Sequence, residues 1–183
     1  MTGFDYQPLY CEENVFRLLA HPQLVRSRRF ALFITNRSRR VAMWAQRAAA
    51  STDPIVWDYH VVLLTLAPAR IWDLDTRLPV PCDLERYLAQ SFLPLEPAVA
   101  SLAPAFRLVP AAELIATFAS DRRHMRTSEG GFTAPPPPWP PPGVGSTLER
   151  YLDLEDAIAG RILASVAALR QAIGALEVTN EDG

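Results

Sequence analysis

The stretch that decides the fold runs from residue 55 to residue 66 and reads Ile-Val-Trp-Asp-Tyr-His-Val-Val-Leu-Leu-Thr-Leu. It is rich in β-branched, aromatic and aliphatic residues, which predicts a central β-strand. A second strand is expected from Ala69 to Asp73, with Pro68 in the connecting turn. If Leu66 and Ala67 lie at the tip of this hairpin, His60 falls opposite Asp73 and the two side chains share one face of the sheet.

Outward from this hairpin, further strands and helices follow from composition and periodicity. Residues 30–35 and 41–44 predict two strands, with the polar residues 36–40 as the hairpin loop between them. Residues 106–109 predict another strand, and helices are expected at 12–20, 83–92 and 111–119. Strands and helices mixed without a regular βαβ alternation predict an α+β fold with a largely antiparallel sheet flanked by helices.

Two features mark the C-terminal part of the chain. Residues 135–142 read Pro-Pro-Pro-Pro-Trp-Pro-Pro-Pro, which predicts a polyproline II strap across the surface, anchored by Trp139. Residues 148–177 predict one long C-terminal helix. The apolar residues recurring along it at helical spacing are Leu152, Ile158, Ile162, Val166, Leu169 and Ile173.

Length and composition restrict the class of protein. The 183 residues fit a single catalytic domain spanning 1–183, and a net charge of -2 provides no field that would attract nucleic acid or a membrane surface. Two cysteines without a secretion signal before them favour a cytoplasmic protein with free thiols. The sequence shows no cluster of metal ligands and implies no cofactor, and nothing in it requires more than a monomer.

Cys11 stands directly before a helix whose first turn carries two acids, Glu12 and Glu13. Backbone N–H groups and the positive end of the helix dipole would favour the thiolate there, and the thiolate is the nucleophilic form of cysteine. The alternative for such a cysteine is a small buried hydrophobic residue. Which of these two roles Cys11 has depends on the residues that lie near it.

His60 and Asp73 provide the partners that a nucleophilic cysteine requires. A carboxylate opposite the imidazole fixes its tautomer and leaves the second ring nitrogen for the thiol. Strand alternation places Asp73 and Asp75 on the same face, so a slip of two residues in the register would select Asp75 instead. The order Cys, His, Asp is that of papain-like and transglutaminase-like enzymes, and the sequence therefore predicts a triad of Cys11, His60 and Asp73.

The chain also resembles the protein N-terminal glutamine amidohydrolase family over about residues 6 to 142. The resemblance is carried by residues 10–14 (YCEEN), 57–64 (WDYHVVLL), 73–76 (DLDT) and 118–125 (FASDRRHM). It implies a papain/transglutaminase-like fold and a Cys-His-Asp triad that converts N-terminal glutamine of proteins or peptides to glutamate and ammonia, without a cofactor. In eukaryotes this step feeds an N-degron pathway. Arg123 departs from the small polar residue usual in its motif, and the chain after Gly143 matches poorly.

Selectivity for a terminal glutamine also requires a carboxylate for the free α-ammonium, and the candidates are Glu13, Asp58, Asp75 and Asp121. His124 is expected to order its loop. Two other functions fit the sequence. One is a different papain/transglutaminase-like acyl-transfer enzyme, such as a peptidase or a deamidase of internal glutamine. The other is a non-catalytic interaction module that presents the proline-rich segment.

Overall fold

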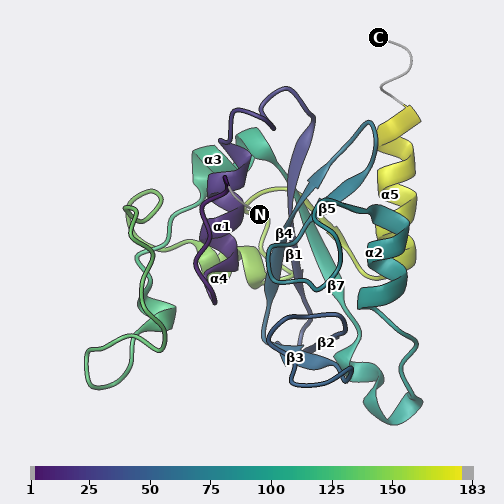
Figure 1. Ribbon diagram of the computed structural model, residues 1–183, viewed down its shortest axis with the longest axis horizontal. Coiled ribbons are helices and arrows are strands. Elements are labelled where there is room, and N and C mark those ends of the chain that lie inside the picture. Colours follow the sequence, from purple (N-terminus) through teal and green to yellow (C-terminus); the bar gives the residue numbers. More distant parts are fainter. Residues whose placement is uncertain (1–2, 179–183) are drawn as a thin grey trace.

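The computed structural model describes residues 3–178, so the ends of the predicted domain, 1–2 and 179–183, lie outside the described residues. A six-stranded antiparallel sheet with the order β6-β5-β4-β1-β7-β8 forms the middle layer. Helices α1, α3 and α4 cover one face, and α2 and α5 cover the other (Figure 1). The predicted α+β class is therefore confirmed. Within residues 3–178, no helix is both long enough and apolar enough to span a bilayer.

The strands are β1 (Arg29–Thr35), β2 (Val41–Met43), β3 (Ile55–Trp57), β4 (His60–Thr65), β5 (Arg70–Trp72), β6 (Cys82–Asp83), β7 (Ala105–Pro110) and β8 (Arg161–Leu163). The α-helices are α1 (Cys11–Leu19), α2 (Leu84–Ser91), α3 (Ala111–Thr117), α4 (Leu148–Leu152) and α5 (Val166–Val178). Two short 3₁₀ helices, η1 (Pro97–Leu102) and η2 (Arg123–Met125), complete the described elements.

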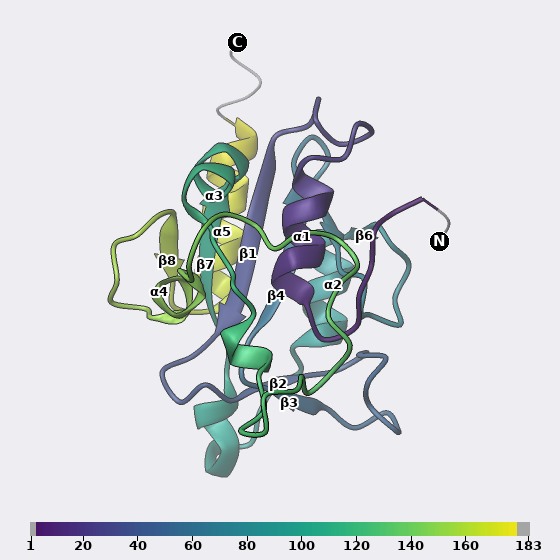
Figure 2. The same cartoon turned by 90° about the vertical axis from the view of Figure 1, so that its left-hand side faces the viewer.

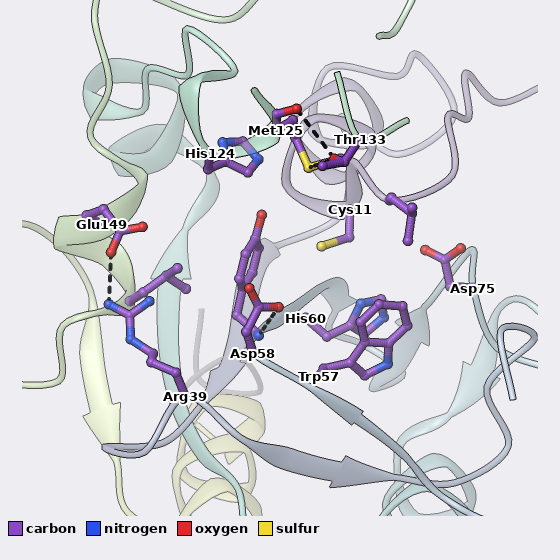
Figure 3. A pocket seen from close by; sticks show the side chains of 13 residues that line it. Cys11, Arg39, Trp57, Asp58, His60, Asp75, His124, Met125, Thr133 and Glu149 are labelled. Atoms are coloured by element: carbon purple, nitrogen blue, oxygen red, sulfur yellow. Dashed lines mark hydrogen bonds and ion pairs between the residues drawn. The ribbon is translucent and has the colours of Figure 1, made fainter. Parts of the chain in front are cut away.

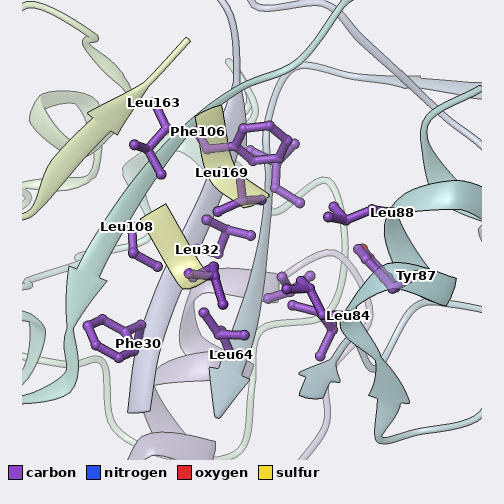
Figure 4. Close-up of a cluster of buried hydrophobic side chains, with 14 of the residues drawn as sticks. Phe30, Leu32, Leu64, Leu84, Tyr87, Leu88, Phe106, Leu108, Leu163 and Leu169 are labelled. Carbon is purple, nitrogen blue, oxygen red and sulfur yellow. The ribbon is translucent and has the colours of Figure 1, made fainter. Parts of the chain in front are cut away.

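The central strands are apolar at nearly every position because both faces of the sheet are covered. Alternate residues of a strand point to opposite faces. In β4, Val62 and Leu64 pack toward α2 and α5, whereas Val61 and Leu63 pack toward α1. Figure 4 shows the first of these two cores, with side chains from the sheet meeting those of α2 and α5. The unbroken apolar run that predicted a central strand thus results from burial on two sides.

The predicted hairpin between residues 30–35 and 41–44 is wrong, although both strands form. β1 pairs with β4 and β7, which occupy both of its edges, and β2 pairs with β3 in a separate two-stranded sheet. Asn36 explains why β1 and β2 do not pair. Its side-chain amide donates to the carbonyls of Arg40, Ser101 and Ala103, and its Oδ1 accepts the Arg40 N–H. This turn directs the chain away from the edge of β1.

The predicted strand at 55–66 is divided in two, because Asp58 and Tyr59 interrupt it between β3 and β4. The predicted register of the following hairpin is also wrong. Leu63 pairs with Trp72 and Leu64 with Ile71, a slip of two residues from the pairing that would place His60 opposite Asp73. A turn containing a left-handed residue, Ala67, at φ 60° lengthens the connection.

The predicted helix over 148–177 is wrong. The chain forms α4, an irregular loop, β8 and α5 in turn. Arg107 of β7 provides the physical reason. It is 1% exposed, and its guanidinium donates to four backbone carbonyls, those of residues 151, 153, 156 and 159. In a continuous helix these carbonyls would accept the helix's own backbone N–H groups. Here they accept from the buried guanidinium instead, because a buried cation must be hydrogen-bonded, and the helix does not form.

The proline-rich segment at 135–142 crosses α1 on the outside of the molecule, and Figure 2 shows it in front of that helix. The carbonyls of Pro137 and Trp139 accept hydrogen bonds from Arg122, and the carbonyl of Pro142 accepts one from the Ser120 N–H. These bonds fasten the segment to the chain that precedes it.

Candidate active site

Cys11 is the first residue of α1 and points into a pocket of about 240 Å³ that His60 also lines (Figure 3). Cys11 is 9% exposed, and it is one of the residues that line this pocket. The expected preference for thiolate is not what the surroundings produce. Burial raises the pKa of the Cys11 thiol, and the charges of Glu12 and Asp75 raise it further, against a backbone hydrogen bond from Val61 that lowers it. The helix start alone therefore does not ionise this thiol.

His60 and Asp73 meet in the structure, with 3.0 Å between His60 Nε2 and Asp73 Oδ1. The contact forms although the strand register is slipped by two residues. β5 ends at Trp72, and the chain then turns so that Asp73 also accepts the backbone N–H of Asp75 at 2.9 Å. The residue predicted from the opposed register is thus brought to His60 by a turn after the strand.

Asp73 is 1% exposed, and hydrogen-bond donors contact both oxygens of its carboxylate. Besides His60 and the Asp75 N–H, its carboxylate accepts from the Tyr87 hydroxyl at 2.8 Å and from Gln46 Nε2 at 3.2 Å. Burial alone would raise the pKa of Asp73, but the charge and hydrogen bond of His60 outweigh it, together with the other donors, and lower that pKa. A buried carboxylate held this way stays ionised beside the imidazole.

His60 is affected in the opposite sense by the same contact. Burial by itself lowers the pKa of His60, but the charge and hydrogen bond of Asp73 and the nearby charges of Asp75 and Glu12 give a net increase. Because Nε2 is taken by Asp73, the nitrogen left for a thiol or a substrate is Nδ1. Trp57 stacks on the imidazole with a centroid distance of 5.6 Å and an interplanar angle of 14°, which fixes the plane of the ring.

The site therefore contains a buried thiol, an imidazole and an oriented carboxylate around one pocket, and comparison with known proteins points to the same chemistry. A family model described as N-terminal glutamine amidase matches residues 6–173. The chain belongs to the N-terminal glutamine amidase family.

Relatives of this family are similar to the chain over most of its length. The chain is 35% identical over 167 residues to the protein N-terminal glutamine amidohydrolase of Danio rerio, and the match covers 84% of this chain and 78% of the relative. It is 37% identical over 142 residues to the protein of that name from Homo sapiens, covering 74% and 69% of the two chains. For the Arabidopsis thaliana protein of that name the identity is 35% over 172 residues, covering 85% and 78%.

The acids proposed from sequence as ammonium ligands separate into two groups in this amidase-family structure. Asp58 and Asp75 line the pocket. Asp75 accepts a hydrogen bond from the Tyr6 hydroxyl at 2.5 Å, and burial raises its pKa, partly offset by the charge of His60 and the Tyr6 hydrogen bond. Asp58 is exposed and accepts the backbone N–H of Tyr59 at 2.9 Å.

The other two candidates, Glu13 and Asp121, are directed elsewhere. Both oxygens of Glu13 accept hydrogen bonds from Arg122, at 2.7 and 2.8 Å, and the Trp139 indole donates to it at 3.0 Å. Asp121 pairs with Arg123 at the surface, and this contact lowers its pKa. Glu13 therefore fastens the proline-rich strap to α1, and neither acid lines the pocket. A buried acid surrounded by donors from its own chain has no free position for a substrate cation.

Sequence reasoning missed Glu12 and assigned His124 only to its loop. Glu12 is 1% exposed, lies 3.6 Å from the Cys11 sulfur through Oε2 and accepts the Tyr59 hydroxyl at 3.1 Å. His124 lines the pocket, with its Nε2 at 3.2 Å from Glu12 Oε1. The only signal in the sequence was the pair of adjacent acids after Cys11, and residue type does not distinguish them.

Within residues 3–178, one cluster of side chains has the composition of a metal site. His60, Asp73 and Asp75 each offer a potential ligand atom, and these atoms lie within 4.8 Å of one another. The hydrogen bonds that join His60 and the Asp75 N–H to Asp73 account for this closeness. We therefore interpret the cluster as an oriented imidazole with a neighbouring carboxylate.

Proposed function

We propose that this protein is an N-terminal glutamine amidohydrolase that uses Cys11 as nucleophile, His60 as general base and acid, and Asp73 to orient His60. The observation that carries the proposal is the 3.0 Å contact between His60 and the buried Asp73 at the pocket into which Cys11 points. Membership of the N-terminal glutamine amidase family supports the substrate class. The relatives named above carry the same activity in their names.

The reaction is an acyl transfer through a thioester. His60 takes the thiol proton as the Cys11 sulfur attacks Cδ of the glutamine side chain. The oxyanion that forms is stabilised by backbone N–H groups at the start of α1. The protonated His60 then donates to the departing nitrogen, and ammonia leaves. Water, deprotonated by His60, attacks the thioester, which releases glutamate and restores the thiol.

This mechanism suits the raised pKa of the Cys11 thiol. A thiol that is not ionised in the free enzyme must lose its proton as the substrate reacts, so a base within reach is required. The net increase in the pKa of His60 makes the imidazole a stronger base, and Asp73 keeps its tautomer fixed. We include in the proposal a fold relationship to papain/transglutaminase-like enzymes, because the order Cys, His, Asp along the chain is theirs.

Recognition of the substrate terminus is assigned to Asp75 and Asp58, the two predicted acids that line the pocket. Asp75 is the better placed, because its carboxylate is close to His60 and hence to the reacting carbon. A charge-assisted hydrogen bond from the substrate α-ammonium would hold the glutamine with its side chain toward Cys11. The absence of this ammonium in an internal or acetylated glutamine would then explain selectivity for the terminus.

The alternative of a different acyl-transfer enzyme is an outcome of the experiment that tests this proposal. The protein is incubated with matched peptides that begin with Gln, Asn or acetyl-Gln, and ammonia and peptide mass are followed. The proposal expects ammonia and a mass increase of about one dalton for the Gln peptide alone, from replacement of –NH₂ by –OH. Cleavage of the peptide backbone, or turnover of acetyl-Gln, would instead indicate a peptidase or an internal deamidase.

Cys11→Ala and Asp75→Asn complete the test. Cys11→Ala is expected to abolish ammonia release while its circular dichroism spectrum stays that of the parent. Asp75→Asn is expected to raise KM for the Gln peptide about tenfold or more, since a hydrogen bond between charged groups is lost. Full activity of Cys11→Ala would refute the assignment of the nucleophile.

The proline-rich segment does not favour the interaction-module alternative. Its carbonyls at Pro137 and Trp139 accept hydrogen bonds from Arg122, and that of Pro142 accepts from the Ser120 N–H. These three carbonyls are therefore already occupied within the domain and are not free for a partner. The two described cysteines are free, and with this we propose a monomeric protein of the reducing cytoplasm, acting on protein or peptide termini.

A further inference from the structure

A second imidazole and carboxylate pair reaches the sulfur of Cys11 through Glu12. Glu12 Oε2 lies 3.6 Å from Cys11 Sγ, and Glu12 Oε1 lies 3.2 Å from His124 Nε2. The carboxylate is 0% exposed and the His124 side chain 16% exposed, so water screens this contact little. The proposed triad does not use either residue.

Glu12 has the properties of a carboxylate that requires a compensating charge. Its Oε2 accepts the Tyr59 hydroxyl at 3.1 Å, but Oε1 is buried and receives no well-aligned hydrogen bond from residues 3–178. The 3.2 Å contact with His124 Nε2 lacks hydrogen-bond geometry, and it becomes an ion pair when His124 is protonated. Glu13, the next acid, is already paired with Arg122, and the imidazole of His124 is the titratable base that the structure places against Glu12.

We propose that His124 is a positioning residue that controls the ionisation of Cys11 through Glu12. With a proton on His124 the pair is neutral, and the thiolate forms beside it during attack. Without that proton the negative charge of Glu12 stands uncompensated next to the sulfur, and the thiol keeps its hydrogen bond to Oε2. The inference rests on the proposed role of Cys11 as nucleophile and adds a second, separate group to the pH dependence of the reaction.

The charges around the two groups support this direction. Around His124 the titratable and charged groups are Glu12, Glu13 and Asp58, with Tyr59 against the ring and Arg122 paired to Glu13. Burial lowers the pKa of His124, but the close Glu12 carboxylate, with the charges of Glu13 and Asp58, gives a net increase. Around Cys11, Glu12 and Asp75 oppose the thiolate.

The test measures the ionisation of Cys11 directly and needs no turnover. The rate of alkylation by iodoacetamide is followed against pH, and peptide mapping separates Cys11 from Cys82. His124→Gln is expected to slow alkylation of Cys11 at pH 7 about tenfold, because one uncompensated charge nearby shifts a pKa by about one unit or more. Glu12→Gln is expected to accelerate it, because the thiol loses the charged acceptor 3.6 Å from its sulfur that favours its protonated form. The double variant is expected to react like Glu12→Gln, because His124 acts only through that carboxylate.

Glu129→Gln is the matched control, since it makes the same substitution at an exposed acid on an outer loop and should leave the rate unchanged. The proposal is overturned if His124→Gln slows alkylation equally with and without Glu12. It is also overturned if Glu12→Gln does not accelerate it. If circular dichroism shows His124→Gln to be unfolded, the pH profiles decide. The parent should then show a step in the alkylation rate of Cys11 that Glu12→Gln lacks, and a step of equal size in both would overturn the proposal. If the parent does not deamidate Gln peptides but the variants change the alkylation rate as expected, the proposed function is refuted and this inference is not.

Discussion

Tyr87 offers a test of the buried network that keeps Asp73 ionised. Its side chain is 0% exposed, and its hydroxyl donates to Asp73 Oδ2 at 2.8 Å. Tyr87→Phe removes this donor and keeps the aromatic ring. A hydrogen bond to a charged group contributes about 1.5–3 kcal/mol, so the free energy of unfolding should fall by that amount. Since the lost bond stabilised the charged form, the pKa of Asp73 should also rise.

Two measurements check this expectation. Urea denaturation gives the free energy of unfolding, and kcat/KM for a Gln peptide across pH gives the acid limb of the activity profile, which should move to higher pH. Tyr151→Phe is the control, because its buried hydroxyl contacts the neutral Thr117 Oγ1 at 2.5 Å. That variant should lose about 1 kcal/mol without moving the acid limb. If both variants change stability equally and neither moves the limb, Tyr87 has no part in holding the Asp73 charge.

Three further predictions concern the strap, the C-terminal loop and pH. Glu13→Gln breaks a buried ion pair with Arg122 and should cost about 3–5 kcal/mol of unfolding free energy, and thermal melting that stays at the parent temperature would contradict this. Arg107→Met leaves the carbonyls of the 153–159 loop without their buried donor, and limited proteolysis should cut there first, whereas a parent-like pattern would refute the explanation of that loop. The raised pKa of His60 stabilises the folded protein fully below about pH 6.5, and this contribution is lost as the pH rises through the pKa of His60 in the folded state. The lowered pKa of Asp73 stabilises the folded protein above about pH 3.9, and this contribution is lost as the pH falls through the pKa of Asp73 in the folded state. The stability gap between the parent and Asp73→Asn, measured in urea, should therefore be widest between these limits and narrow above them, and a gap that widens toward alkaline pH would exclude the ion pair.

Local sequence signals predicted the elements better than their pairing. The apolar runs at 30–35 and 106–109 form strands as expected, and α1 begins at Cys11, because burial and propensity act over a few neighbouring residues. The partner of β2 was not predictable from its own residues, because pairing depends on which edges of β1 are occupied. The helix predicted over 148–177 failed for a similar reason, since the donor that reorganises its carbonyls, Arg107, belongs to a distant strand.

The sequence by itself determined that a cysteine opens a helix, that a histidine lies in a strand next to an acid, and that two more acids follow the cysteine. Only the tertiary structure decided the roles of those two acids. Successive residues of a helix point about 100° apart, so Glu12 and Glu13 must face different surroundings, but periodicity does not say which. The packing of α1 against β4 and the strap turns Glu12 toward the sulfur and Glu13 toward Arg122. Direction around a helix axis is fixed by what the helix packs against, and those contacts come from remote parts of the chain.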